Sequence, residues 1–211
     1  MKILLYGDSI TDAGRNKDVR HTSVPWAYGY GYPTLIAAEL LSEDPTKYTV
    51  VNRGISGNRI VDLYSRIKAD VWNEKPDVLS ILIGINDIWH ELNYQNGVEL
   101  ERFDKIYRML IEDTKKVLSD VKIMLIEPFV LKGTATEEKF EGFTEVYKYS
   151  EAINKIAEDY GCVFVPTQKK LSEAAEKFGA EHYLYDGVHP MLAGAKLITD
   201  EWLNKFKKEI L

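Results

Sequence analysis

Five short apolar segments recur along the chain, and longer stretches with helical spacing separate them. The segments occupy residues 2–6, 48–52, 78–83, 122–127 and 162–165. They are rich in β-branched residues, which is typical of strands that are buried on both faces of a sheet. Parallel strands need long crossover connections, so this alternation predicts a parallel sheet with helices on both sides.

Helices are indicated where apolar residues stand three and four positions apart. One such face runs from Ile60 to Val71, and a second runs from Ile106 to Val117. Because the chain has no internal repeat or low-complexity segment, these elements predict a single domain over residues 1–211. We expect a three-layer α/β/α sandwich around a doubly wound, five-stranded parallel sheet in flavodoxin-like order. Further helices are expected at residues 32–41, 143–160, 168–178 and 191–208.

The composition excludes several classes of partner. The 33 acidic and 27 basic residues give a formal net charge of -6 and form no basic stripe, so nucleic acid is not expected as a partner. No segment approaches the length of an apolar membrane span, and the first residues lack the apolar stretch of a signal peptide, which favours a cytoplasmic protein. The sequence has no zinc-like ligand spacing, no G-x-G-x-x-G and no P-loop lysine, so we expect neither a metal nor another cofactor.

A serine stands directly after the first predicted strand, in the sequence Gly7-Asp8-Ser9. Ligands of doubly wound sheets bind outside the carboxyl ends of the strands, so Ser9 occupies a position suited to a nucleophile. The alternative is a structural serine that caps a helix or closes a turn. This turn alone does not decide between the two.

His189 is the histidine best placed to act as a base for that serine. Asp186 precedes it by three residues in a turn with a glycine, a spacing that lets the carboxylate reach the imidazole Nδ1 while Nε2 faces Ser9. The same turn also reads as the capped start of the final predicted helix, with Pro190 in its first turn. No carboxylate occupies a comparable turn beside the other histidines, which we expect at the surface or in packing contacts: His21, His90 and His182.

Two further turns supply candidate hydrogen-bond donors. Acyl transfer develops negative charge on an oxygen, and each preorganised donor aimed at that oxygen is worth about 3 kcal/mol. The candidates are the backbone N–H groups of Ser9 and Gly57 and the side-chain amide of Asn86. Ordinary turn geometry explains the glycine and the asparagine equally well when each is taken alone.

Four blocks of the sequence together match a known pattern. The resemblance is to the GDSL or SGNH hydrolase family, and it covers nearly the whole chain. It implies the SGNH hydrolase fold, with Ser9 as nucleophile, His189 as base and Asp186 as its orienting acid. It also implies that Ser9, Gly57 and Asn86 form the oxyanion hole. The blocks are Gly7-Asp8-Ser9-Ile10-Thr11, Gly57 within residues 52–58, Gly84-Ile85-Asn86-Asp87 and Asp186-Gly187-Val188-His189-Pro190.

Longer versions of these blocks resemble a smaller group of enzymes within this family. Residues 7–15, 29–33, 51–58 and 83–89 are similar to bacterial single-domain carbohydrate acetylesterases that act on acetylated xylo-oligosaccharides. This likeness implies a serine esterase that removes acetyl groups from a small carbohydrate ester. The aromatic residues near the nucleophile have an alternative role, which is packing in the core or between subunits. The formation of a homo-oligomer is therefore an open alternative. We expect substrate contacts from these residues: Asp8, Trp26, Tyr30 and Trp89.

Two other functions fit parts of the same pattern. A lysophospholipase or acyl thioesterase would keep the site and change the substrate, although Glu91, Asn93 and Gln95 make the segment after the third strand polar rather than lid-like. A non-catalytic carbohydrate-binding module would keep only the shape of the site. The complete set of candidate nucleophile, base, acid and donors argues against that module.

Overall fold

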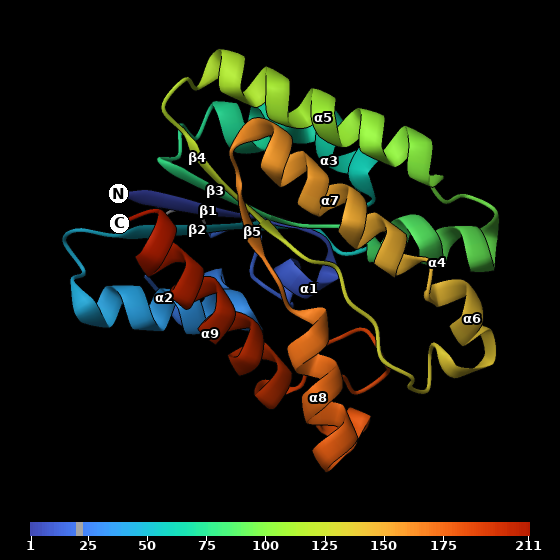
Figure 1. The fold of residues 1–211 in the computed structure, drawn as a ribbon. Helices are drawn as coiled ribbons and strands as arrows, with labels where there is room; N and C mark the ends of the chain where they lie inside the picture. The colour runs from blue at the N-terminus through green and yellow to red at the C-terminus, as the bar shows by residue number, and fades with distance from the viewer. Residues whose placement is uncertain (20–22) are drawn as a thin grey trace.

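The computed structural model describes residues 1–19 and 23–211 of the chain. A parallel sheet of five strands lies in the middle of this described part, with helices on both faces (Figure 1). The strand order β2-β1-β3-β4-β5 is the flavodoxin-like order, so the predicted fold class is confirmed. The strands are β1 (Lys2–Gly7), β2 (Thr49–Gly54), β3 (Val78–Leu82), β4 (Lys122–Ile126) and β5 (Val163–Val165).

Helices complete the two outer layers of the sandwich. Helices α3, α5 and α7 cover one face of the sheet, and α2 and α9 cover the other (Figure 1). Helix α3 continues into a π-helical turn, Lys68–Trp72, and the short 3-10 turns are Pro25–Ala27, Glu137–Lys139 and Ala180–His182. The α-helices are α1 (Ser9–Asp12), α2 (Tyr32–Glu43), α3 (Ile60–Ile67), α4 (Ile85–Tyr94), α5 (Leu100–Val117), α6 (Phe140–Phe143), α7 (Val146–Tyr160), α8 (Gln168–Phe178) and α9 (Leu192–Glu209).

The central strand β1 explains why its sequence reads as an unbroken apolar run. Ile3, Leu4, Leu5 and Tyr6 have no exposed surface, because helices pack on both faces of the sheet. A polar group in this core is satisfied in place: the Nε1 of the fully buried Trp202 donates to Ser80 Oγ at 2.9 Å. The core therefore holds β1 rigidly, together with the turn that follows it.

Two helical segments differ from the sequence prediction. The polar segment after β3 is not a loop but helix α4, whose buried residues Ile85 and Ile88 stand at helical spacing. Trp89 therefore projects from this helix. The helix expected at residues 143–160 is divided, because α6 ends at Phe143 and α7 begins at Val146.

The final helix also begins later than the capped start suggested. Helix α9 starts at Leu192, and its N-cap residue is Met191, without a side-chain cap. Pro190 instead pairs with Leu184 in a short antiparallel bridge, which keeps the preceding turn extended and out of the helix. The capped-helix interpretation of Asp186 is therefore wrong.

The turns that carry the candidate residues meet at one edge of the sheet. Gly7 at the end of β1 is in register with Gly54 of β2 and with Leu82 of β3, so three following turns leave the sheet side by side. The strand order reverses between β1 and β3, and ligands bind at such switch points in doubly wound folds. No helix in the described part of the chain is long and apolar enough to cross a membrane.

Candidate active site

Four separate segments line one small cavity at this edge of the sheet. Its volume is 170 Å³, and we call it the smaller cavity. Ser9 comes from the start of α1, Gly57 from the turn after β2, Asn86 from the first turn of α4, and His189 from the turn before α9. The structure thus brings together the residues that the sequence suggested as nucleophile, donors and base. Ser56, Trp89, His90 and Tyr94 complete the lining.

Ser9, His189 and Asp186 form one continuous line of hydrogen bonds. Ser9 Oγ lies 2.9 Å from His189 Nε2, and His189 Nδ1 lies 2.7 Å from Asp186 Oδ2. The other carboxylate oxygen, Asp186 Oδ1, accepts the backbone N–H groups of Val188 and His189 at 2.9 and 2.8 Å. The carboxylate is therefore held through both oxygens. Such a line can pass a proton from a hydroxyl to an imidazole whose orientation is set by an acid.

The charges along this line favour a base that can hold a proton. Burial disfavours the charged form of His189, but the hydrogen bond and the charge of Asp186, with a contribution from Asp8, raise the pKa of the imidazole above its ordinary value. Burial likewise opposes the charge of Asp186, yet its bonds to His189 and to the backbone hold the pKa of the carboxyl below its usual range. An ionised acid thus stands behind an imidazole that becomes more basic.

The turn that carries Ser9 depends on a close approach of backbones. A Cβ on Gly7 would stand 2.4 Å from the carbonyl oxygen of Leu82, so only glycine fits where β1 passes β3. Asp8 is the N-cap residue of α1, and its Oδ1 accepts the backbone N–H of Ile10 at 3.0 Å. Asp8 therefore caps helix α1, and the Ser9 hydroxyl forms its hydrogen bond with His189.

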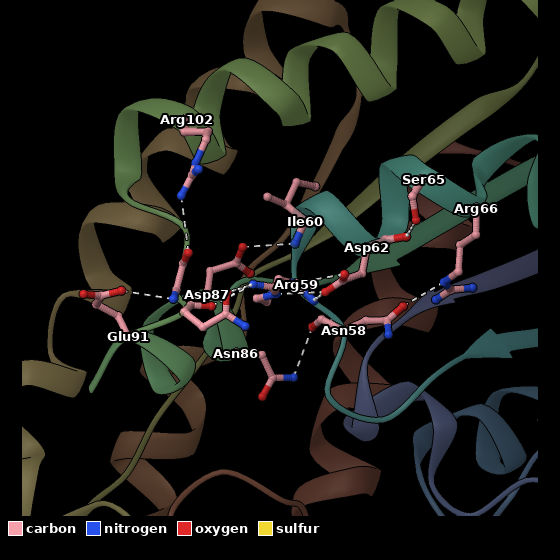
Figure 2. A network of polar contacts seen from close by, with 12 residues as sticks. Asn58, Arg59, Ile60, Asp62, Ser65, Arg66, Asn86, Asp87, Glu91 and Arg102 are labelled. Atoms are coloured by element: carbon pink, nitrogen blue, oxygen red, sulfur yellow. Dashed lines mark hydrogen bonds and ion pairs between the residues drawn. The ribbon is translucent and has the colours of Figure 1, made fainter. Parts of the chain in front are cut away.

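The segments that carry the donor candidates are joined by hydrogen bonds. Asn86 Nδ2 donates to the backbone oxygen of Asn58 at 3.1 Å, and Asp87 Oδ1 accepts the backbone N–H of Ile60 at 3.0 Å (Figure 2). A side-chain amide carries two N–H bonds, so Asn86 keeps a second one for a ligand. Gly57 has a backbone φ of +81°, a left-handed conformation that favours glycine.

Asp12 ties the Gly57 turn to the helix of Ser9. Its Oδ2 accepts the backbone N–H of Ser56 at 3.0 Å, and the same oxygen lies 3.0 Å from Lys17 Nζ. Asp12 is almost fully buried, whereas Lys17 is half-exposed. The bond from Ser56 to Asp12 thus fixes the Gly57 turn relative to Ser9. The bond from Asn86 to Asn58 in turn fixes the start of α4 relative to the Gly57 turn.

A second cavity adjoins the smaller one at Ser9 and His189. This larger cavity has a volume of 380 Å³ and shares Ser9, Ser56 and His189 with the smaller one. Its charged groups can form hydrogen bonds with a polar ligand, and its tyrosines can stack on one. The remaining lining residues are Asp12, Gly14, Arg15, Lys17, Tyr30 and Tyr185.

The four residues expected to contact substrate occupy different positions. Trp89 lines the smaller cavity and Tyr30, which is 70% exposed, lines the larger one. Trp26 is exposed but lines neither cavity. Asp8 has no exposed surface, and burial raises its pKa to about 7. A side chain without exposed surface cannot touch a ligand, so the structure does not support Asp8 as a substrate contact.

Sequence reasoning missed three aromatic or basic residues of the site. His90 and Tyr94 line the smaller cavity one and two turns beyond Asn86, and only the recognition of α4 as a helix would have indicated them. Tyr185 lines the larger cavity and stacks on His189; its place directly before Asp186 was the available signal. His182 is exposed beside Glu181, as expected, and His21 lies outside the described residues.

No cluster of metal-ligating side chains accompanies this site. Across residues 1–19 and 23–211, no group of three or more His, Cys, Asp or Glu residues is placed to hold a metal ion. The chemistry described above uses protein groups alone, namely a hydroxyl, an imidazole, a carboxylate and N–H donors.

Known proteins resemble this chain in sequence and in fold. Residues 5–197 match the model of the GDSL-like lipase/acylhydrolase family. A candidate GDSL-like lipase from Parabacteroides merdae is 34% identical, with a TM-score of 0.93 over 98% of this chain and 95% of its own. The acetylxylan esterase of Geobacillus stearothermophilus is 32% identical over 209 residues, which are 97% of this chain and 93% of the relative. Its crystal structure has a TM-score of 0.88 over 99% of this chain and 94% of its own, at 33% identity.

Proposed function

Because the chain belongs to the GDSL-like lipase/acylhydrolase family and is a carboxylic ester hydrolase, we propose that it removes acetyl groups from a carbohydrate through an acyl-enzyme. In this proposal Ser9 is the nucleophile, His189 the general base and Asp186 the acid that orients it. The backbone N–H groups of Ser9 and Gly57 and the amide of Asn86 form the oxyanion hole.

The observation that carries the proposal is the unbroken line from Ser9 Oγ through His189 to Asp186, with bonds of 2.9 and 2.7 Å. A serine hydroxyl is a weak nucleophile until a base removes its proton. Here the base is within hydrogen-bond reach before any substrate binds. The carboxylate behind it favours the tautomer that leaves Nε2 free to accept that proton.

The first half-reaction forms a bond to Ser9 and breaks the ester. Ser9 Oγ attacks the carbonyl carbon, its proton passes to His189 Nε2, and the carbonyl electron pair moves onto oxygen, where the donors of the oxyanion hole stabilise it. When that electron pair returns, the C–O bond to the sugar breaks. The departing sugar oxygen takes the proton from His189, and the acetyl group stays on Ser9.

The second half-reaction releases the acetyl group. A water molecule gives its proton to His189 and attacks the acyl carbonyl, so that a second oxyanion forms in the same place. Collapse breaks the bond to Ser9 Oγ, which recovers the proton from His189. Acetic acid leaves and loses its proton to the solvent, and the line of hydrogen bonds is restored.

The two cavities support a short acyl group and a larger alcohol. The donors Gly57 and Asn86 line the smaller cavity, so the acyl group points into it, where Trp89 and Tyr94 limit its length. The alcohol then occupies the larger cavity, whose charged and tyrosine side chains suit a sugar. A relative that is described as an acetylxylan esterase supports an acetylated carbohydrate as the substrate class. A lysophospholipase or thioesterase would need more room on the acyl side.

Replacing the nucleophile tests the mechanism. We expect Ser9→Ala to abolish hydrolysis of p-nitrophenyl acetate while the circular dichroism spectrum and the unfolding temperature stay the same. Ser56→Ala is the matched control, because Ser56 lines both cavities but does not bond to His189. An organophosphonate should label wild type and Ser56→Ala, and it should not label Ser9→Ala. Full activity of Ser9→Ala would rule out the assigned nucleophile.

A chain-length series tests the substrate class separately. We expect acetyl esters to be hydrolysed faster than butyryl and octanoyl esters, and acetylated xylo-oligosaccharides to lose acetate as measured by mass spectrometry. A preference for octanoyl esters would favour the lysophospholipase or thioesterase alternative. That result would leave the catalytic residues unaffected.

A further inference from the structure

The imidazole of His189 has two neighbours that the proposed mechanism does not use. The ring of Tyr185 lies parallel to it, with centroids 5.6 Å apart and an interplanar angle of 18°. The ring of Trp89 lies at 5.9 Å and is tilted by 51°. Tyr185 lines the larger cavity and Trp89 the smaller one, so each cavity contributes one aromatic contact to the base. Among these contacts only that of Tyr185 is a stacked one.

The backbone fixes the position of Tyr185 relative to His189. Leu184 pairs with Pro190 in an antiparallel bridge, and this register places Tyr185 directly opposite His189. The N–H of Tyr185 donates to the carbonyl oxygen of His189 at 3.1 Å. Side chains of directly opposite residues lie on the same face of such a pair and contact each other. The stacked arrangement therefore follows from the chain path and not from a free rotamer.

Hydrogen bonds reach the edges of the imidazole and leave its faces to other groups. Asp186 contacts the Nδ1 edge of the ring and Ser9 the Nε2 edge, but neither covers its face. During catalysis the ring gains a proton and becomes a cation. The face of an aromatic ring attracts a cation. At partly exposed sites this attraction strengthens binding of the cation by about two- to fivefold. Tyr185 is itself 49% exposed, which places this contact in that class.

We propose that Tyr185 is a positioning residue for the base: it holds the imidazole of His189 by stacking and stabilises its protonated form during proton transfer. The inference rests on the proposed role of His189. It adds to the orienting acid a second group that acts on the base, and it gives an aromatic side chain of the larger cavity a task other than contact with the substrate.

Other charged groups also act on His189 and must be kept constant in a test. Asp186 and Asp8 favour its protonated form, and His90 shares the smaller cavity with it. Asp12, Arg15 and Lys17 line the larger cavity on the side of Tyr185. The contribution of Tyr185 to proton binding by His189 is therefore measured by comparing variants that keep all these charged groups.

The test compares two variants of Tyr185. Tyr185→Phe keeps the ring, so we expect kcat within twofold of wild type. Tyr185→Leu removes the ring, so we expect a two- to fivefold fall in kcat for p-nitrophenyl acetate. We also expect two- to fivefold weaker proton binding by His189, read as a midpoint at lower pH when the imidazole proton resonances are titrated by NMR. The His189 signal is assigned by its loss in His189→Gln.

Tyr147→Leu is the matched control, because Tyr147 lies on α7, is 42% exposed and lines neither cavity. It should leave the imidazole titration and kcat unchanged. If Tyr185→Leu only raised KM for sugar esters, as Tyr30→Leu should, Tyr185 would be a substrate contact and the proposal would fail. An unchanged titration in Tyr185→Leu would also overturn it. Because the titration needs no turnover, it gives an answer even if Ser9 proves not to be the nucleophile.

Discussion

The two cavities that share Ser9 are built from different kinds of residue. The smaller one is lined by groups that the fold holds in place: Asn86 is buried and bonded to Asn58, and Gly57 sits in a turn that Asp12 anchors through Ser56. The larger one is bordered in part by exposed side chains, such as Tyr30 and Lys17. The bond-breaking step needs fixed donors, whereas the alcohol needs only room and contacts. Changes in the smaller cavity should therefore affect kcat, and changes in the larger one KM.

The largest effect should come from a donor in the smaller cavity. We expect Asn86→Ala to lower kcat for p-nitrophenyl acetate by about 10²- to 10³-fold, because one oxyanion donor is lost, with little change in KM. Asn86→Asp keeps the size of the side chain but loses its N–H donors, so it should be no better than alanine. Recovery of activity in Asn86→Asp would mean that Asn86 acts through packing instead of through its amide.

The wall of the smaller cavity should control acyl length. Trp89→Ala creates space beside the donors, and each methylene that is buried there gains roughly 0.8 kcal/mol. We therefore expect the ratio of kcat/KM for butyryl over acetyl esters to rise about tenfold, even if both rates fall because His189 loses a neighbour. Tyr94→Ala, at the exposed end of α4, should change the ratio less. An unchanged ratio in Trp89→Ala would place the acyl group in the larger cavity.

The pH dependence of kcat/KM should report on the charges of His189 and Asp8. His189 must be neutral to accept a proton, and its pKa is raised, so kcat/KM should fall with decreasing pH through a midpoint above the ordinary pKa of a histidine. The charge of Asp8 contributes to that rise. Asp8→Asn keeps an oxygen for the N–H of Ile10 and removes the charge, so its midpoint should lie at lower pH than that of wild type. A midpoint that does not move would show that Asp8 stays protonated over this range.

The smallest effect should come from the surface of the larger cavity. Tyr30→Ala removes an exposed ring, and we expect KM for an acetylated xylo-oligosaccharide to rise about two- to tenfold at constant kcat. Hydrolysis of ethyl acetate, which is too small to reach Tyr30, serves as the control and should not change. An equal loss with both esters would mean that the two cavities are not divided between acyl group and alcohol.

Patterns that depend on local chemistry were readable from the sequence. Strands such as Ile3 to Tyr6 are buried on both faces, so every residue is apolar and the run is recognised. The site residues Ser9, Gly57, Asn86 and His189 follow strand ends or precede the last helix, where the rules for doubly wound sheets place ligands. The structure brings these residues together, as the sequence predicted.

Patterns that depend on tertiary contacts were not readable. Helix α4 carries Glu91, Asn93 and Gln95 close together, and this density of polar residues hid the spacing of Ile85 and Ile88. Asp8 is polar but fully buried, because it caps helix α1, whose residues 10–12 are themselves buried. The contact of Tyr185 with His189 arises from a bridge of a single residue pair. Such a short bridge leaves no periodic pattern in the sequence.

The candidate nucleophile and its base are separated by 180 positions in the chain, and the last strand, β5, ends at Val165 before the base is reached. During synthesis from the N-terminus, the residues of all the described strands leave the ribosome before Asp186 and His189 do. With Ser9 and His189 in the proposed roles, a nascent chain at that stage would carry its serine and its donor turns but would not cleave esters. The order of residues thus delays activity until synthesis has passed His189.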